Sequence, residues 1–187
     1  MLVAMRACAA ILVMSGLLSL ASRVSADTVK QPTCSEPAAK PRAAKAIADV
    51  DWCNFDYGGG KGSRLTAGRS SLHLYRKLGE PHDTIARTLR GVIYGDLDGD
   101  KKREAAIILQ HTTRFASRDT PSSSTTVYIY TLVDGAPRLL GSIPAADPVS
   151  EVSFAKGVVT VRSGTPTTAA RYRRDRAGDF NEIAPAP

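Results

Sequence analysis

The strongest constraint on the fold is a succession of short apolar runs separated by turn signals. Residues 127–133 (VYIYTLV) lead into 134–135 (DG), a dipeptide typical of tight hairpin turns, and residues 138–143 (RLLGSI) run back. Further pairs of short runs flank 155–157 (AKG) and 176–178 (RAG). Successive short strands joined by tight turns predict a mainly β fold, an antiparallel meander that forms either an open barrel or a sandwich.

The same pattern extends toward the amino terminus. Residues 71–78 (SLHLYRKL) begin with period-two alternation, and residues 89–94 and 105–110 are apolar runs of strand length on either side of an acidic loop. A parallel sheet would require crossover helices, and the spacing of these runs leaves no room for them. The polar residues 114–126 (RFASRDTPSSSTT) are expected to form a mobile loop.

Residues 1–26 have the pattern of a signal peptide. One basic residue, Arg6, precedes a short apolar stretch, and residues 24–26 (VSA) place small side chains where signal peptidase requires them. An uncleaved anchor would need about 20 apolar residues, more than lie between Arg6 and Arg23. We therefore expect cleavage before Asp27, export to a periplasmic or extracellular compartment, and no transmembrane anchor after cleavage.

The chain after the expected cleavage site divides into two parts. Residues 27–41 are polar and contain three prolines, so a flexible N-terminal segment is expected. Residues 42–50 (RAAKAIADV) are rich in alanine and predict a short helix. Length and pattern together indicate that residues 42–187 form a single β-rich domain.

The net charge bears on the choice of partner. The formal charge of the whole chain is +7, and cleavage removes two arginines and no acidic residue. This modest excess excludes the strongly basic pattern of nucleic-acid-binding proteins. It favours an anionic envelope polymer, or another exported protein, as the partner.

Two cysteines, Cys34 and Cys53, remain after the signal peptide is removed with Cys8. In an oxidising compartment this pair is expected to form a disulfide. A redox-active or metal-bound thiol fits less well, because the sequence has no C-x-x-C motif and no histidine near either cysteine. The disulfide would close a loop of about 20 residues and fasten the amino-terminal segment to the domain.

The clearest chemical pattern is a group of four acidic residues between two of the apolar runs. Asp96, Asp98 and Asp100 occupy alternate positions, and Glu104 follows them. A loop that curls back on itself would bring several carboxylate oxygens to one point. Calcium prefers six to eight oxygen ligands and tolerates irregular geometry, so it suits such a loop.

This D-x-D-G-D-x-x-x-E spacing between apolar strands resembles the calcium loops of FG-GAP and related VCBS-type repeats, as a single degenerate copy. The resemblance implies that Asp96, Asp98, Asp100 and Glu104 are ligands of a calcium ion. It does not imply a propeller, because the motif does not recur along the chain. An EF-hand is excluded, because that motif needs its glycine and its last glutamate at other positions.

A loop without metal is the alternative reading of the same residues. Lys101, Lys102 and Arg103 lie inside the acidic group and can offset its self-repulsion. Aspartates in tight turns also accept hydrogen bonds from backbone amides, and Gly99 tolerates positive φ. The sequence leaves both possibilities open.

A second charged feature lies near the carboxyl terminus. Residues 171–176 (RYRRDR) are expected to form an edge strand with Arg171 and Arg173 on one face and Arg174 and Arg176 on the other. These four arginines are candidates for contact with an anionic partner. Alternatively, their charges protect an exposed edge from pairing with another chain.

Catalytic patterns are missing from the sequence. The three histidines are scattered, His73 is expected to be a solvated strand residue, and no G-x-S-x-G or H-E-x-x-H motif occurs. We therefore expect a small exported binding or structural module without catalysis, whose loop of residues 96–104 is either a weak calcium site or a turn without metal. The alternative is a hydrolase or lyase that acts on envelope polymers through acidic residues, since sequence spacing cannot exclude a pair of carboxylates.

Overall fold

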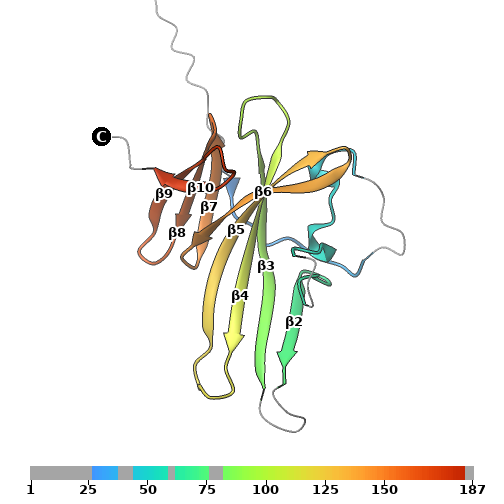
Figure 1. The fold of residues 1–187 in the computed structure, drawn as a ribbon, viewed down its shortest axis with the longest axis vertical. Coiled ribbons are helices and arrows are strands. Elements are labelled where there is room, and N and C mark those ends of the chain that lie inside the picture. Colours follow the sequence, from blue (N-terminus) through green and yellow to red (C-terminus); the bar gives the residue numbers. More distant parts are fainter. Residues whose placement is uncertain (1–26, 38–43, 59–61, 76–81, 184–187) are drawn as a thin grey trace, which may run out of the picture.

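A computed structural model describes residues 27–37, 44–58, 62–75 and 82–183. The strands form two five-stranded antiparallel sheets that pack as a sandwich (Figure 1). The predicted mainly β, antiparallel fold is therefore confirmed. The predicted signal peptide, residues 1–26, lies outside the described residues. Within the described ranges, no helix combines the length and the apolar character needed to cross a membrane.

Each sheet follows the order of the chain almost completely. The first sheet has the order β2-β3-β4-β5-β6. Its strands are β2 (Arg69–Leu74), β3 (Asp83–Gly95), β4 (Glu104–Arg114), β5 (Ser122–Val133) and β6 (Ala136–Ala145). The second sheet has the order β1-β7-β8-β9-β10. Its strands are β1 (Asp27–Thr28), β7 (Val149–Ala155), β8 (Val158–Ser163), β9 (Thr168–Arg174) and β10 (Phe180–Ile183).

Two of the hairpin turns have the geometry that their sequences predict. Asp134 and Gly135, between β5 and β6, have φ values of 50° and 76°. Lys156 and Gly157, between β7 and β8, also have φ values of 50° and 76°. Two successive residues with positive φ are typical of type I′ turns, whose twist matches that of the strands they connect.

The core between the sheets contains apolar side chains from both of them. The first sheet contributes Ile93, Ala106, Ile108, Val127, Ile129 and Ile143. The second sheet contributes Val149, Val152, Phe154, Val159, Val161 and Phe180. Residues from two inner faces that interdigitate in this way are the usual core of a sandwich.

The other face of the first sheet is covered by the amino-terminal part of the domain. Trp52 is only 3% exposed and lies in a second apolar cluster with Ile107, Leu109 and Tyr130. Strand β4 is therefore buried on both faces. This explains why residues 105–109 are a continuous apolar run and do not alternate.

The predicted helix over residues 42–50 is wrong for the part of that range that the structure describes. The chain makes a single 3-10 turn there, η1 (Ile47–Asp49), and a second such turn, η2 (Trp52–Asn54), follows just after the predicted range. The Asp49 carboxylate accepts hydrogen bonds from two preceding backbone amides at 3.0 and 2.8 Å, which holds η1 as an isolated turn. A helix this short gains little from alanine content, so burial of the apolar side chains against the sheet decides the geometry.

Residues 27–37, where the sequence predicts a flexible segment, make specific contacts. Asp27 and Thr28 form β1 and pair with β7 at the edge of the second sheet. Val29 packs against the core and lies so close to Gly91 that a Cβ atom on Gly91 would overlap it. These contacts hold the segment against the sandwich.

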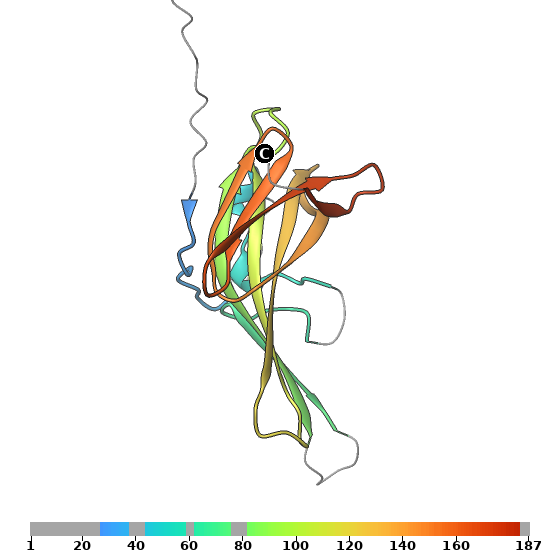
Figure 2. The same cartoon turned by 90° about the vertical axis from the view of Figure 1, so that its left-hand side faces the viewer.

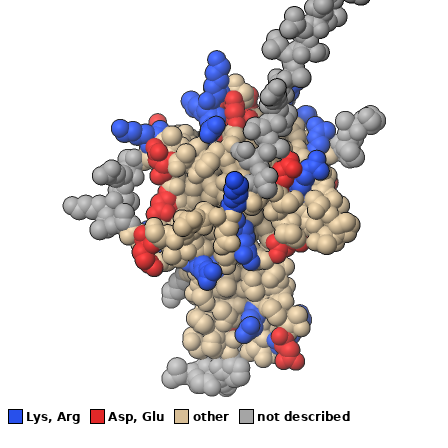
Figure 3. Space-filling model, turned by 180° about the vertical axis from the view of Figure 1, so that it is seen from behind, with Lys and Arg blue, Asp and Glu red and all other residues tan. Residues whose placement is uncertain are grey.

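The long strands of the first sheet project beyond the second sheet (Figures 1 and 2). The mobile loop predicted over residues 114–126 is too long, because β4 continues to Arg114 and β5 already begins at Ser122, which leaves residues 115–121 between the two strands. The hydroxyl-rich residues 122–126 (SSSTT) pair with β4 through the backbone, and polar side chains suit a sheet that is open to water. Figure 3 shows few charged side chains on the projecting part in that view.

Candidate metal site

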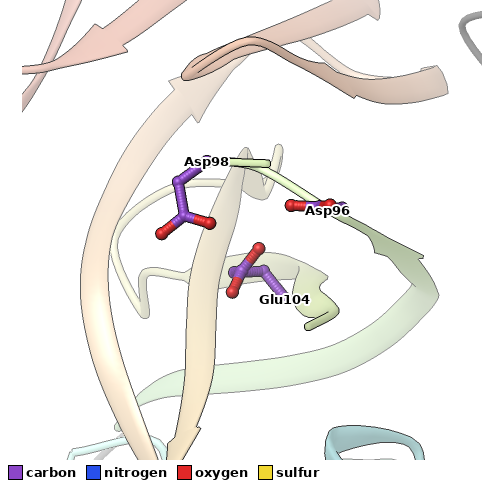
Figure 4. A group of neighbouring side chains, drawn as sticks. All are labelled: Asp96, Asp98 and Glu104. Carbon is purple, nitrogen blue, oxygen red and sulfur yellow. The ribbon is translucent and has the colours of Figure 1, made fainter. Parts of the chain in front are cut away.

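The acidic loop connects β3 to β4. Asp96 directly follows β3, Asp98 lies in the loop, and Glu104 is the first residue of β4. Each of these residues offers a carboxylate oxygen, and the oxygens lie within 4.8 Å of one another. Figure 4 shows the carboxylates directed toward a common space. The structure thus brings together three of the four predicted ligands.

The side chains of the loop shape its backbone. The Asp96 carboxylate accepts hydrogen bonds from the backbone amides of Gly99 at 2.7 Å and Lys101 at 3.0 Å. The Asp98 carboxylate accepts one from the amide of Asp100 at 3.1 Å. Gly99 and Lys101 have φ values of 86° and 68°. The left-handed conformation at two positions lets the chain curl back toward Asp96.

Asp100, the fourth predicted ligand, is directed elsewhere. Its carboxylate accepts a hydrogen bond from the backbone amide of Lys102 at 2.7 Å and lies 3.7 Å from the ammonium group of the same residue. Both side chains are largely exposed, so this ion pair contributes little to stability. Asp100 therefore stabilises the turn and lies outside the converging group.

Glu104 is the buried member of the group, with 4% of its surface exposed. One carboxylate oxygen accepts a hydrogen bond from the amide of Leu97 at 2.8 Å, and the other accepts one from the hydroxyl of Thr131 at 3.3 Å. Burial raises the pKa of the Glu104 carboxyl, and the negative charges of Asp98 and Asp100 act in the same direction. The two hydrogen bonds oppose this rise only in part.

The raised pKa of Glu104 makes the free energy of unfolding depend on pH in a definite direction. The folded protein binds this proton more tightly than the unfolded chain does. The free energy of unfolding therefore falls as the pH rises from the unfolded-state pKa, about 4.3, through the folded-state pKa of Glu104. Above its folded-state pKa the ionised carboxylate is a buried negative charge, which a bound cation would offset.

The loop is connected directly to the second sheet. The side chain of Leu97 belongs to the core between the sheets, and its carbonyl accepts a hydrogen bond from the amide of Gly157 at 2.6 Å. At the end of β3, a Cβ atom on Gly95 would overlap the ring of Phe154. A ligand that fixes the loop would therefore also fix the contact between the two sheets.

The chemistry of the group suits a hard cation. Its members offer carboxylate oxygens only, and hard cations such as Ca²⁺ and Mg²⁺ prefer oxygen ligands. Asp98 is exposed, so water could complete the coordination shell. Asp96, Asp98 and Glu104 could therefore hold a metal ion.

The predicted disulfide between Cys34 and Cys53 is confirmed, with a Cα–Cα separation of 5.5 Å. It joins the amino-terminal segment to η2, which lies over the buried face of the first sheet. Disulfides of this kind persist in oxidising compartments.

The basic residues near the carboxyl terminus are placed differently from the prediction. β9 is not an edge strand, because β10 pairs with it on the outer side. Tyr172 packs against the core between the sheets, so alternation directs Arg171 and Arg173 to the outer face. The guanidinium of Arg174 donates a hydrogen bond to the carbonyl of Leu140 at 2.9 Å and connects the two sheets. Arg176 is exposed in the turn that follows β9.

Two groups at the site were not recognised in the sequence. The amide of Leu97 and the hydroxyl of Thr131 hold the Glu104 carboxylate. Thr131 lies 27 residues from Glu104 in sequence, and the pairing of Ala105 with Tyr130 brings it there. The β4–β5 register is the signal that could have identified it.

A hollow of about 360 Å³ lies beside the disulfide. It is lined by Gln31, Pro32, Cys34, Thr66, Ala67, Gly68, Arg69, Thr88 and Leu89. This lining contains no carboxylate, so the hollow gives no support to an acid-dependent hydrolase or lyase.

Searches found no family model that matches this chain, no matching curated protein and no matching solved structure. Its function is therefore inferred from the geometry of its own side chains.

Proposed function

We propose that this protein is an exported β-sandwich module with a binding or structural role, stabilised by a calcium ion in the loop of residues 96–104. The observation that carries the proposal is the convergence of three carboxylates in a loop that is bonded to both sheets. The disulfide supports export, because such bonds are rare where thiols are kept reduced.

Calcium is the proposed ion because all the converging side chains offer oxygen and because the loop geometry is irregular. The resemblance of the loop to FG-GAP calcium loops supports the same choice. Extracellular calcium modules commonly have dissociation constants of about 10⁻⁴ to 10⁻³ M. The ion would offset the charge of buried Glu104 and fix the loop against the second sheet.

Addition of about 5 mM calcium to metal-stripped protein is expected to raise the free energy of unfolding by about 1 to 2 kcal/mol. For a domain of this size, the melting temperature rises by about 3 to 8 °C. Thermal melts with calcium and with a chelator measure the shift, and calorimetric titration measures the affinity. An unchanged melt together with no heat of binding would leave the loop as a turn held by its own hydrogen bonds.

Two aspartate variants provide a matched comparison. Asp98→Asn removes a charge from the converging group, whereas Asp100→Asn removes the same charge from a neighbour outside it. Both asparagines keep a carbonyl oxygen that can accept the backbone hydrogen bond of the native side chain. The calcium shift should disappear in Asp98→Asn and persist in Asp100→Asn. Equal losses in both variants would mean that only the summed charge of the loop matters.

Glu104→Gln separates the effect of the metal from the effect of the charge. The side-chain amide of glutamine can accept a hydrogen bond from the backbone amide of Leu97 and donate one to the hydroxyl of Thr131. The variant therefore still has a hydrogen bond to each of these two groups. In chelator at neutral pH the variant should melt at a higher temperature than the native protein, and it should not respond to calcium. The difference in melting temperature between the variant and the native protein should become smaller as the pH falls toward the folded-state pKa of Glu104.

The proposal includes an anionic envelope polymer as the partner. Arg171 and Arg173 are its candidate contacts, since both lie on the outer face of the second sheet. Arg162 on the neighbouring strand is already paired with Glu151 at 3.3 Å. Arg174, by contrast, is engaged with the backbone of β6.

Binding of poly(glycerol phosphate) tests this surface. Replacing Arg171 and Arg173 together by glutamine should weaken binding by about three- to tenfold, and added salt should reduce the difference. A double variant of Arg114 and Arg138, two exposed arginines of the first sheet, has the same change in charge and serves as the control. Equal weakening in both double variants would show that net charge, not this face, governs the binding.

A further inference from the structure

Two histidines meet at the end of the first sheet farthest from the acidic loop. His73 lies on β2 opposite Thr84, and His82 precedes β3. His82 and Thr84 are two residues apart and therefore face the same side of the sheet, which makes the two imidazoles diagonal neighbours. The whole length of β3, about 40 Å, separates this pair from Asp96.

The facing nitrogens have the spacing of two ligands of one metal ion. Nδ1 of His73 and Nε2 of His82 are 2.9 Å apart. Imidazole nitrogens bind Zn²⁺ at about 2.0 to 2.1 Å. Two nitrogens at such distances in adjacent positions of a square plane are roughly 2.9 Å apart. The same spacing also fits a hydrogen bond between the two rings.

The surrounding side chains favour this arrangement. The remote nitrogen of His73 lies 3.4 Å from the hydroxyl of Ser71. A proton on that nitrogen leaves the lone pair of Nδ1 free to coordinate, and partners of this kind orient metal-binding histidines. The ring of Tyr75 packs on that of His82 with the centroids 4.4 Å apart. His73 is exposed, and water can therefore supply further ligands.

We propose that His73 and His82 form a binding site for a late first-row divalent transition metal ion, with copper(II) bound more tightly than zinc(II). Imidazole ligands suit these ions, and copper(II) leads the divalent series in affinity. The site is chemically distinct from the acidic loop, because nitrogen ligands give no advantage to calcium. The chain would then carry a hard-cation site and a transition-metal site at opposite ends of β3.

Titration of copper(II) into the purified protein, with calcium in excess to occupy the acidic loop, tests the site. We expect one equivalent to bind, with an electron paramagnetic resonance spectrum that shows coupling to imidazole nitrogen. His73→Gln and His82→Gln should each weaken binding by at least about tenfold. Both positions lie outside the apolar core, and circular dichroism checks that the variants remain folded.

The third histidine supplies the control. His111→Gln removes an imidazole from a different position on β4, and it should leave the copper affinity unchanged. Copper binding that persists at full strength in both His73→Gln and His82→Gln would place the ion elsewhere, for example at the amino terminus, and overturn the proposal. Equal weakening by all the histidine variants would also overturn it, because binding would then not depend on the facing pair.

Discussion

Replacement of Trp52 by alanine is expected to lower the free energy of unfolding by about 3 to 5 kcal/mol. The indole is 3% exposed and lies against Phe55, Tyr57 and Tyr130, with ring centroids 5.0, 6.4 and 5.1 Å away. Removing it opens a cavity beneath a segment that has little regular structure of its own.

Urea unfolding followed by circular dichroism measures the effect. Tryptophan fluorescence cannot be used, because the variant lacks the single tryptophan of the chain. Trp52→Phe should cost less, because a ring remains in the cluster. Leu139→Ala, at a residue that is 46% exposed, is the matched control and should change stability by about 0.5 kcal/mol or less. A decrease of less than about 1 kcal/mol in the free energy of unfolding for Trp52→Ala would mean that the amino-terminal layer, the segment with η1 and η2 that covers the first sheet, adds little to the stability of the fold.

The position of the amino-terminal layer could not be predicted from the sequence, whereas the hairpins could. The hairpins were predictable because a turn is local, and the dipeptide at 134–135 specifies both the turn and the direction of the next strand. The apolar run at 105–109 was predictable as a strand. What covers its second face was not, because Trp52 and its neighbours come from a segment whose position depends on contacts distant in sequence.

The candidate metal site also has features that the sequence predicted and features that only the structure shows. The spacing names four acidic residues as ligands, and three of them, Asp96, Asp98 and Glu104, converge in the structure. The exclusion of Asp100 depends on the loop backbone, where Lys101 adopts positive φ. The burial of Glu104 depends on the packing of the two sheets. Local pattern therefore names the residues, while tertiary structure assigns their roles.

The arginines of β9 illustrate an edge-strand prediction that was wrong although the neighbouring hairpin over residues 176–178 was predicted. Residues 171–176 have the composition of a protected edge. β10, with only four residues, follows them and becomes the edge itself. Arg174 consequently bonds to the carbonyl of Leu140 in the other sheet and is not free for a partner. The predicted hairpin already covers one side of β9, and β8 covers the other side, so the composition of residues 171–176 was no guide to their place in the sheet.

The second large effect is expected for removal of the disulfide. Replacing Cys34 and Cys53 together by serine should lower the free energy of unfolding by about 3 kcal/mol, because the unfolded chain loses the restraint of the closed loop. The bond also has a native role. The amide of Gly68 donates to the carbonyl of Cys53 at 2.8 Å, and the amide of Leu89 donates to the carbonyl of Gly68 at 2.8 Å. The disulfide is thus linked through the backbone to β3.

Urea unfolding of the oxidised protein, the reduced protein and the double serine variant measures this effect. Reducing agent should lower the stability of the native protein to that of the variant and should not affect the variant. A loss below about 1 kcal/mol would contradict the expected restraint.

A cycle with Trp52→Ala distinguishes the two origins of the disulfide's effect. If the bond acts only on the unfolded chain, its removal and the loss of Trp52 are independent, and their effects on the free energy of unfolding should add. If the bond also holds the amino-terminal layer in place, the two effects should not add. The free energy of unfolding of the triple variant should then decrease by less than the sum of the decreases for Trp52→Ala and the double serine variant, by about 1 kcal/mol or more. The hydrogen bonds from Cys53 through Gly68 to Leu89 favour the second outcome, because Trp52 adjoins Cys53 and packs in the same cluster as Leu89.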